Sequence, residues 1–261
     1  MPAADRPGSL RSETIIRPWA MRLVLPMAIF VLWAIAAKRA GNDFLLPGPA
    51  RVWTAFIELW RIGRFIPDLL VSLGRVGLGF LLASLMGMPL GFLAGRSSGF
   101  TRIAQGTLNF LRQVPPVALV PMLLLWLGLG EAPKLLVIIY ASFFPIFLAA
   151  ELGAREADPG LIEVGRLYHR GPIAVLRKVV IPAALPVVVT GLRLGLGYGW
   201  RSLVVAEMLA AARGMGALIV EARAFGRMDR MLVGVLAIGA AGTILDYALR
   251  ALERLFTWDK S

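Results

Sequence analysis

The chain has 261 residues, of which 58% are hydrophobic and only 17% are charged, and its mean hydropathy is +0.73. Soluble domains carry about 25% charged residues, so this composition excludes an ordinary soluble protein and favours a chain that places its apolar side chains in a lipid bilayer. The chain has no cysteine and one histidine, which excludes disulfides, thiolate metal sites and a three-histidine zinc site.

The formal net charge of +12 is compatible with a nucleic-acid partner or with anionic lipid headgroups. The basic residues are distributed between apolar blocks rather than gathered in one segment, and no nucleic-acid-binding motif is present. We therefore interpret the charge as membrane-related, with lipid rather than nucleic acid as the partner.

Apolar blocks of the length of a membrane-spanning helix recur along the chain. The first follows a basic N-terminus and resembles a secretory signal, but its long lead-in and the further blocks favour an uncleaved span. The third is interrupted by Pro115, Pro116 and Pro121, which predicts a broken helix or, alternatively, a short re-entrant or surface helix followed by a shorter span. The predicted blocks are residues 23–37, 69–95, 103–129, 135–154, 183–210 and 231–252.

Two connections between the blocks are long. Residues 41–68 include an amphipathic stretch with aromatic residues suited to a membrane interface. Residues 155–182 form a charged connection whose length suggests a role. We predict an N-terminal tail at 1–22, a single transmembrane domain at 23–254 and a C-terminal tail at 255–261. Arginine counts moderately favour cytoplasmic termini, although the opposite side is also rich in arginine.

Glycines recur every four residues in two blocks, at Gly87, Gly91 and Gly95 and at Gly191, Gly195 and Gly199. Such spacing lets helix backbones approach closely. Ordinary packing inside one subunit is the favoured interpretation, and a sliding or dimer interface is the alternative.

Charged residues also fall within or near the apolar blocks, where a central charge costs about 2.5–3.5 kcal/mol unless it pairs or faces water. We expect Arg75 and Asp246 to lie at span ends and reach the interface. Arg201 and Glu207 are the better candidates for a functional polar contact. They are six residues apart, so they do not share a helix face.

Sequence signatures of enzymes are missing. No glycine-rich loop with a lysine matches a phosphate-binding loop, and no nucleophile–histidine arrangement is available. The chain is therefore predicted to have no ATP site and no bound cofactor of its own.

The connection after the fourth block resembles the "EAA" loop through which permease subunits of ABC importers contact their ATPases. The family motif is Glu-Ala-Ala, three residues, Gly, nine residues and Ile-x-Leu-Pro. Here Ala-Ala is replaced by Val164-Gly165, and His169 occupies the position of the motif glycine, with Gly171 two residues later. The resemblance implies a coupling loop formed by Glu163, Val164, Gly165, Tyr168, His169, Gly171, Val179, Ile181 and Pro182.

Other segments are similar to the nitrate/sulfonate/taurine subfamily of these permeases. They are Leu46-Pro47-Gly48-Pro49, the stretch from Leu111 to Pro121, the stretch from Gly199 to Glu207, and Gly214-Met215-Gly216. Within them, the candidate pathway or gating residues are Arg112, Gln113, Pro115, Pro116, Trp200, Arg201 and Glu207.

The resemblance implies an all-α integral membrane protein with about six transmembrane helices and the type I importer permease fold. It implies a second permease chain, often identical, two ATPase subunits that hold ATP and Mg²⁺, and a periplasmic or lipid-anchored binding protein. It also implies the bacterial inner membrane and a small solute such as nitrate, taurine or a sulfonate.

Two other functions stay open at this point. One is an integral membrane enzyme acting on a lipid-linked substrate, which would need convergent carboxylates near a membrane boundary. The other is an ion-coupled secondary transporter, a class that commonly shows internal repeats; this sequence shows no convincing one.

Overall fold

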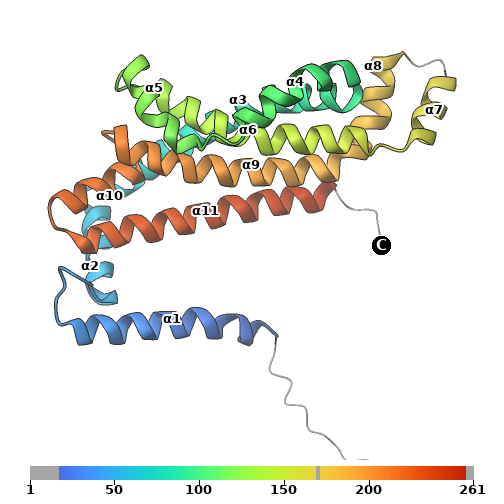
Figure 1. The fold of residues 1–261 in the computed structure, drawn as a ribbon. Helices are drawn as coiled ribbons and strands as arrows, with labels where there is room; N and C mark the ends of the chain where they lie inside the picture. The colour runs from blue at the N-terminus through green and yellow to red at the C-terminus, as the bar shows by residue number, and fades with distance from the viewer. Residues whose placement is uncertain (1–17, 169–170, 257–261) are drawn as a thin grey trace, which may run out of the picture.

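The computed structural model describes residues 18–168 and 171–256, and this part of the chain is helical without strands (Figure 1). Five helices are long and apolar enough to cross a membrane, and the bent pair α4 and α5 makes a sixth when counted as one span. The helices are α1 (Pro18–Ala40), α2 (Pro49–Arg61), α3 (Phe65–Arg96), α4 (Ser98–Leu111), η1 (Pro116–Leu119), α5 (Val120–Leu127), α6 (Glu131–Arg155), α7 (Pro159–Leu167), α8 (Pro172–Val175), η2 (Leu176–Val180), α9 (Ile181–Ala210), α10 (Met215–Ala224) and α11 (Met228–Phe256).

Helix α6 lies between α3 and α9, and both glycine stripes face it. A Cβ atom at Gly95 of α3 would lie 2.5 Å from the carbonyl oxygen of Glu151 on α6. A Cβ atom at Gly195 of α9 would lie 2.8 Å from Cγ1 of Ile146 on α6. The stripes thus permit close packing inside the chain, which confirms the favoured interpretation over a sliding or dimer interface.

The third apolar block is broken, as its prolines predict. The chain turns by 79° between α4 and the segment of η1 and α5. The break frees backbone groups at the end of α4, and the hydroxyl of Tyr140 on α6 donates a hydrogen bond to one of them, the carbonyl oxygen of Leu111.

The amphipathic stretch predicted in residues 41–68 is helix α2. Its buried side chains, Val52, Ala55 and Leu59, pack into a cluster with Met215 of α10 and Val233 of α11. Its tryptophans lie on the other face and are more than half exposed, as expected for a helix at a membrane interface.

Helix α1 runs beside the bundle but apart from it (Figure 1), and its apolar side chains are almost all exposed. The indole N–H of Trp33 on α1 donates a hydrogen bond to the carbonyl oxygen of Pro47, 3.2 Å away. An exposed apolar helix of this length needs lipid or another membrane chain around it.

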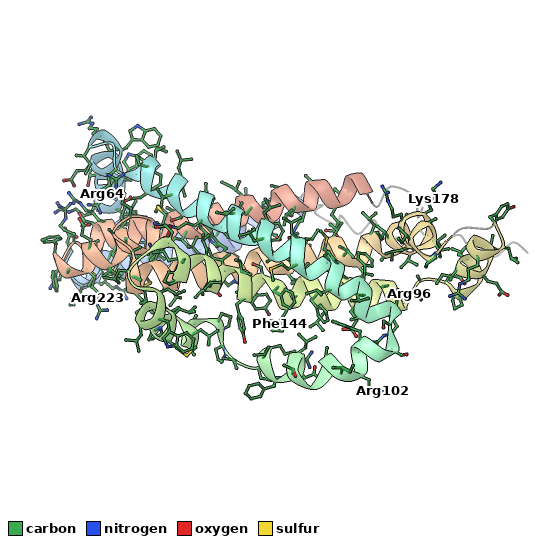
Figure 2. All side chains as sticks on the ribbon, turned by 90° about the horizontal axis from the view of Figure 1, so that it is seen from above. Arg64, Arg96, Arg102, Phe144, Lys178 and Arg223 are labelled. Carbon is green, nitrogen blue, oxygen red and sulfur yellow. The ribbon has the colours of Figure 1, made fainter. Side chains whose placement is uncertain are left out.

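The two ends of the bundle differ. The α10 end is formed by α2, α10 and the start of α11, whereas the α7 end is formed by α7, α8 and the last turn of α3 (Figure 1). Arg64 and Arg223 lie at the α10 end and Arg96 and Lys178 at the α7 end (Figure 2). The long connections of the chain therefore lie at opposite ends of the bundle.

Arginines at the α10 end are tied to carboxylates of neighbouring elements. Glu58 of α2 accepts hydrogen bonds from Arg227 (2.8 Å) and Arg230 (2.6 Å), and these hold the pKa of Glu58 below its usual value. Arg64 pairs with Glu221 of α10 and lowers the pKa of that carboxyl as well. These arginines join helices to one another.

Candidate functional site

Helix α7 extends beyond the α7 end of the bundle (Figure 1). It begins where the side chain of Asp158 accepts a hydrogen bond from the backbone N–H of Gly160 (2.7 Å), with Pro159 in the first turn. Ile162 is buried against Val175 and Val180. Gly165 permits this contact, because a Cβ atom there would lie 3.2 Å from Cγ2 of Val179.

The opposite face of α7 is apolar and uncovered. Leu161, Val164, Leu167 and Tyr168 are exposed, the last two to 72% and 74%. Their spacing of three or four residues places them on one stripe. Glu163 is also exposed and forms no ion pair or hydrogen bond with the described residues. The arrangement is that of a short helix that offers a surface to a partner.

The remaining residues of the predicted coupling loop connect α7 to the membrane. Gly171 precedes α8 and its carbonyl oxygen accepts from the N–H of Ala174 (2.9 Å). Val179 belongs to η2, and Ile181 and Pro182 begin α9. His169 lies outside the described residues, so the predicted effect of its departure from the family glycine stays a prediction.

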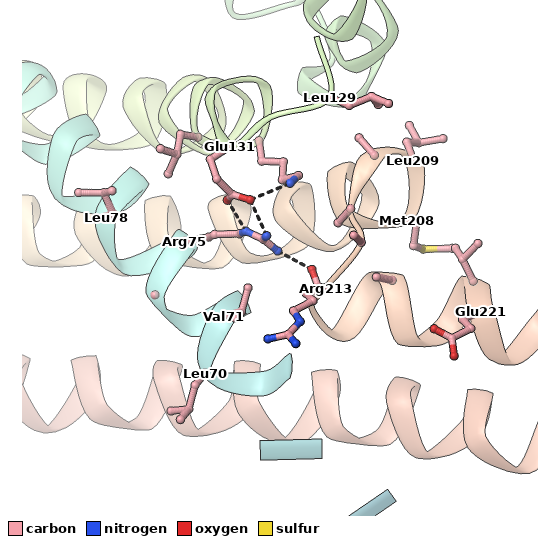
Figure 3. A pocket seen from close by; sticks show the side chains of 18 of the residues that line it. Leu70, Val71, Arg75, Leu78, Leu129, Glu131, Met208, Leu209, Arg213 and Glu221 are labelled. Carbon is pink, nitrogen blue, oxygen red and sulfur yellow. Dashed lines mark hydrogen bonds and ion pairs between the residues drawn. The ribbon is translucent and has the colours of Figure 1, made fainter. Parts of the chain in front are cut away.

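A polar cluster around the buried Arg75 lies at the α10 end, and Figure 3 shows Arg75 and Glu131. The guanidinium of Arg75 on α3 donates to both carboxylate oxygens of Glu131 on α6 (2.6 and 2.7 Å) and to Glu207 on α9 (2.7 Å). Ser72 contacts the Glu207 carboxylate at 2.8 Å, and Lys134 donates to Glu131 at 2.9 Å. Three spanning helices are thus joined by compensated charges.

This cluster corrects the expectation for Arg75, which does not reach for the interface but is buried and paired on both sides. Asp246 pairs with Arg193 (2.5 Å) and Arg250 (2.9 Å) five residues before its candidate span ends at Ala251, so its expected reach to the interface stays a prediction. Pairing compensates a charge inside a bundle, so Arg75 does not need a span end. Sequence reasoning missed Glu131 and Lys134; their three-residue spacing at the start of a span was the available signal.

The turn between α9 and α10 is held by the same cluster. Glu207 accepts from the N–H of Gly216 (3.0 Å), Ser72 Oγ accepts from the N–H of Met215 (2.9 Å), and Arg75 donates to the carbonyl of Arg213 (2.7 Å). Gly214 has φ +122°, and a Cβ atom there would lie 2.5 Å from Cδ of Glu207. Only glycine fits this position.

A cavity of about 1100 Å³ opens beside the cluster (Figure 3). Arg75, Glu131 and Lys134 line it on one side, and the α9–α10 turn with Arg213 lines it on another. Apolar residues of α3, including Leu70 and Leu78, complete the wall. The cavity is therefore an apolar hollow with opposite charges at one edge.

The predicted pathway residues fall in three places. Arg112 ends α4, and Gln113, Pro115 and Pro116 form the bend that follows. Arg201 is exposed on α9 in a hollow of about 680 Å³ between α9 and α11, with its guanidinium 5.8 Å from the ring centre of Tyr198.

Two of these residues have packing roles. Trp200 is buried and its indole N–H donates to the carbonyl of Ile238 on α11 (3.2 Å). Glu207 is fully buried in the polar cluster, as the partner of Arg75 and not of Arg201. The structure therefore leaves Arg112 and Arg201 as exposed cations with no acidic partner among the described residues.

Residues 87–258, which include α6, α7, α9 and the polar cluster residue Glu207, match the family described as binding-protein-dependent transport system inner membrane component. The chain belongs to this family. The match covers most of the chain, and it confirms the family to which the loop and the segment around Glu207 were compared.

Relatives of this inner membrane component extend over nearly the whole chain. A Bacillus subtilis protein named as an aliphatic sulfonates transport permease, SsuC, is 35% identical over 93% of this chain and 89% of its own length. The taurine transport system permease protein TauC of Escherichia coli is 33% identical over 89% of this chain and 86% of its own length. The nitrate import permease protein NrtB of Synechocystis is 29% identical, over 94% and 90% respectively.

Solved structures confirm the fold of the inner membrane component. A chain of the MetNI methionine ABC transporter in an inward-facing conformation superposes with a TM-score of 0.67, covering 76% of this chain and 98% of that chain at 18% identity. A second, from an amino acid ABC transporter, gives a TM-score of 0.60 at 18% identity, covering 77% and 96%. The family is one of transport, which favours the importer interpretation over a lipid enzyme or an ion-coupled transporter.

Proposed function

We propose that this chain is the permease subunit of an ABC importer that carries a small anion of the sulfonate, taurine or nitrate class. A binding protein delivers the solute, and a separate pair of ATPase subunits supplies the energy. The names of three relatives support this class of substrate. The observation that carries the proposal is α7, a helix with an uncovered apolar stripe and an unpaired glutamate at one end of a membrane bundle.

The coupling step follows from the packing of α7. A short helix that presents an apolar stripe can seat in a groove of a soluble partner. Its buried face contacts α8 and η2, which continue into α9, so movement of a docked ATPase would be passed to the span. The coupling loop would comprise Glu163, Val164, Gly165, Tyr168, His169, Gly171, Val179, Ile181 and Pro182.

The proposed orientation puts the α7 end in the cytoplasm and the α10 end toward the binding protein. Both tails, residues 1–22 and 255–261, would then be cytoplasmic, on either side of a single domain at 23–254. In this orientation the excess of arginine on the cytoplasmic side is small, because the α10 end also carries arginines. Three of these, Arg64, Arg227 and Arg230, are ion-paired and have structural roles. A second copy of this chain is the proposed partner across the pathway and beside the exposed α1.

Arg112 and Arg201 are the proposed contacts of the anion. An unpaired guanidinium in a span needs water or a counter-charge, which a solute pathway supplies. The test is Arg112→Glu, with uptake of nitrate, taurine and alkanesulfonates measured in cells. Arg102→Glu, on the exposed surface of the same helix α4, is the control. We expect uptake to fall in the first variant only; unchanged uptake of all three anions would remove Arg112 from the pathway.

The experiment on the coupling role is a mild-detergent pull-down of the tagged chain from native membranes, with mass spectrometry of the partners. We expect an ATPase with a phosphate-binding loop to copurify and to be lost in Glu163→Lys, because the new cation meets the docking groove. Asp43→Lys makes the same charge change in the exposed α1–α2 connection and should keep the ATPase. Retention of the ATPase by Glu163→Lys, with normal ATP-dependent uptake, would refute the coupling role.

A further inference from the structure

An apolar groove of about 890 Å³ lies at the α7 end, between the last turns of α3 and the segment formed by α7, α8 and η2. Leu85, Met88 and Phe92 of α3 form one wall, and Ile173 and Leu176 form the other. Leu85 and Ile173 are exposed to 60% and 72%. The groove continues into the exposed apolar face of α3, which runs the length of the bundle.

Two arginines stand in the lining of this groove, Arg96 at the end of α3 and Arg166 of α7. Both are exposed, and neither guanidinium forms an ion pair or hydrogen bond with the described residues. They come from separate elements, so the groove combines a long apolar wall with two cations that lack a counter-charge.

The length of α3 places the first of these cations, Arg96, at the membrane surface. Its 32 residues extend about 48 Å at 1.5 Å per residue, more than the ~30 Å of the hydrocarbon core. The final turn, which carries Arg96, therefore reaches the level of the lipid headgroups. The walls below it, at Leu85 and Met88, lie at the level of the acyl chains.

We propose that this groove binds one anionic phospholipid, with its phosphate between Arg96 and Arg166 and an acyl chain along α3. The ligand is argued from charge and shape: two unpaired guanidiniums suit a phosphate, and an apolar wall that opens toward the bilayer suits a fatty chain. This site is additional to the proposed transport function and uses none of its pathway residues.

The site and the proposed ATPase contact occupy different faces of α7. Ile162 and Arg166 are four residues apart and face the groove, whereas Val164 and Tyr168 lie on the uncovered stripe. A bound lipid would therefore support α7 from the membrane side while a partner docks on the other side.

Native mass spectrometry of the purified full chain, given equal amounts of phosphatidylglycerol and phosphatidylcholine with the same acyl chains, tests the proposal. We expect preferential retention of phosphatidylglycerol, weakened about fivefold by Arg96→Gln and by Arg166→Gln and on the order of 25-fold by both. Arg102→Gln removes an exposed arginine of α4 outside the groove and should leave the preference unchanged. Leu85→Trp narrows the groove and should lower retention with both arginines present.

Equal retention of the two lipids by the unmodified chain would overturn the proposal. So would a loss in Arg102→Gln as large as in Arg96→Gln, because the effect would then be one of overall charge. Displacement of the lipid by a copurified protein partner would show that the groove is a protein-docking site instead. Each variant is first checked for an unchanged melting temperature, so that a lost preference reports the site and not the fold.

Discussion

Replacement of Glu207 by glutamine should destabilise the chain strongly. The carboxylate accepts hydrogen bonds from Arg75 (2.7 Å), Ser72 (2.8 Å) and the N–H of Gly216 (3.0 Å), and its side chain is fully buried. A glutamine side chain has one acceptor oxygen and one NH2 donor group, so its NH2 group would face at least one of these donors without a hydrogen bond. The negative charge that compensates Arg75 from α9 would also be lost.

The expected magnitude follows from these contacts. Removal of one member of a buried ion pair costs about 3–5 kcal/mol. Arg75 keeps its two hydrogen bonds to Glu131, which favours the lower end, about 3 kcal/mol. Because 1 kcal/mol shifts the melting temperature of chains of this size by about 2–4 °C, the expected decrease is about 6–12 °C.

The assay is thermal unfolding of the purified chain in detergent. Glu151→Gln is the matched control, since Glu151 pairs with Arg155 one turn away and Arg155 is more than half exposed. Such a pair contributes about 0.3–0.5 kcal/mol, which predicts a shift of no more than about 2 °C. A Glu207→Gln variant that melts within about 2 °C of the unmodified chain would refute the reasoning that this cluster holds α3, α6 and α9 together.

Two further predictions concern packing and pH. Gly95→Ala should destabilise the chain by about 1–3 kcal/mol, because its Cβ atom would meet the carbonyl oxygen of Glu151 on the facing helix α6. Gly77→Ala, on the same helix α3, has open space and should be neutral or slightly stabilising. Thermal unfolding of the two variants compares them. Arginine partners hold the pKa values of Glu58 and Glu221 below their usual range, so their stabilisation is complete above the unfolded pKa of about 4.3 and is lost as the pH falls below it. Melting temperature should therefore drop on acidification below about pH 4.5, less steeply in Glu58→Gln, and an identical slope in that variant would contradict the assignment.

The spans could be predicted from sequence because they depend on local composition. Each apolar block except the third became one helix, and the prolines around residue 115 placed the break in the third. The boundaries moved by a few residues; α3 begins at Phe65 and not at 69, because Asp68 in its first turn pairs with Arg64 and is not a break in the helix.

The polar cluster could not be predicted in the same way. Arg75, Glu131 and Glu207 come from three helices. Arg75 and Glu131 are 56 residues apart and Glu131 and Glu207 are 76 residues apart, so no local spacing relates them. Their pairing depends on the order in which α3, α6 and α9 pack, and hydropathy does not encode that order. The expectation that Arg75 reaches an interface used only its position in the block.

The coupling loop could be predicted from the sequence in part. The spacing from Glu163 to Pro182 pointed to a family, and Gly165 had a role that spacing alone does not give, close packing on Val179. The exposed stripe that includes Leu167 became evident only once the buried face of α7 was known.

The length of helix α9 has a mechanical consequence. Helix α9 (Ile181–Ala210) is a rod of 30 residues, about 45 Å long at 1.5 Å per residue, and α8 stands at a steep angle to its start (Figure 1). The glycine contacts of α9 on α6 leave little room for bending in the middle of the rod. Such a rod acts as a lever: a tilt of about 5° about its α7 end would displace the α9–α10 turn by about 4 Å, most of the rise of one helical turn.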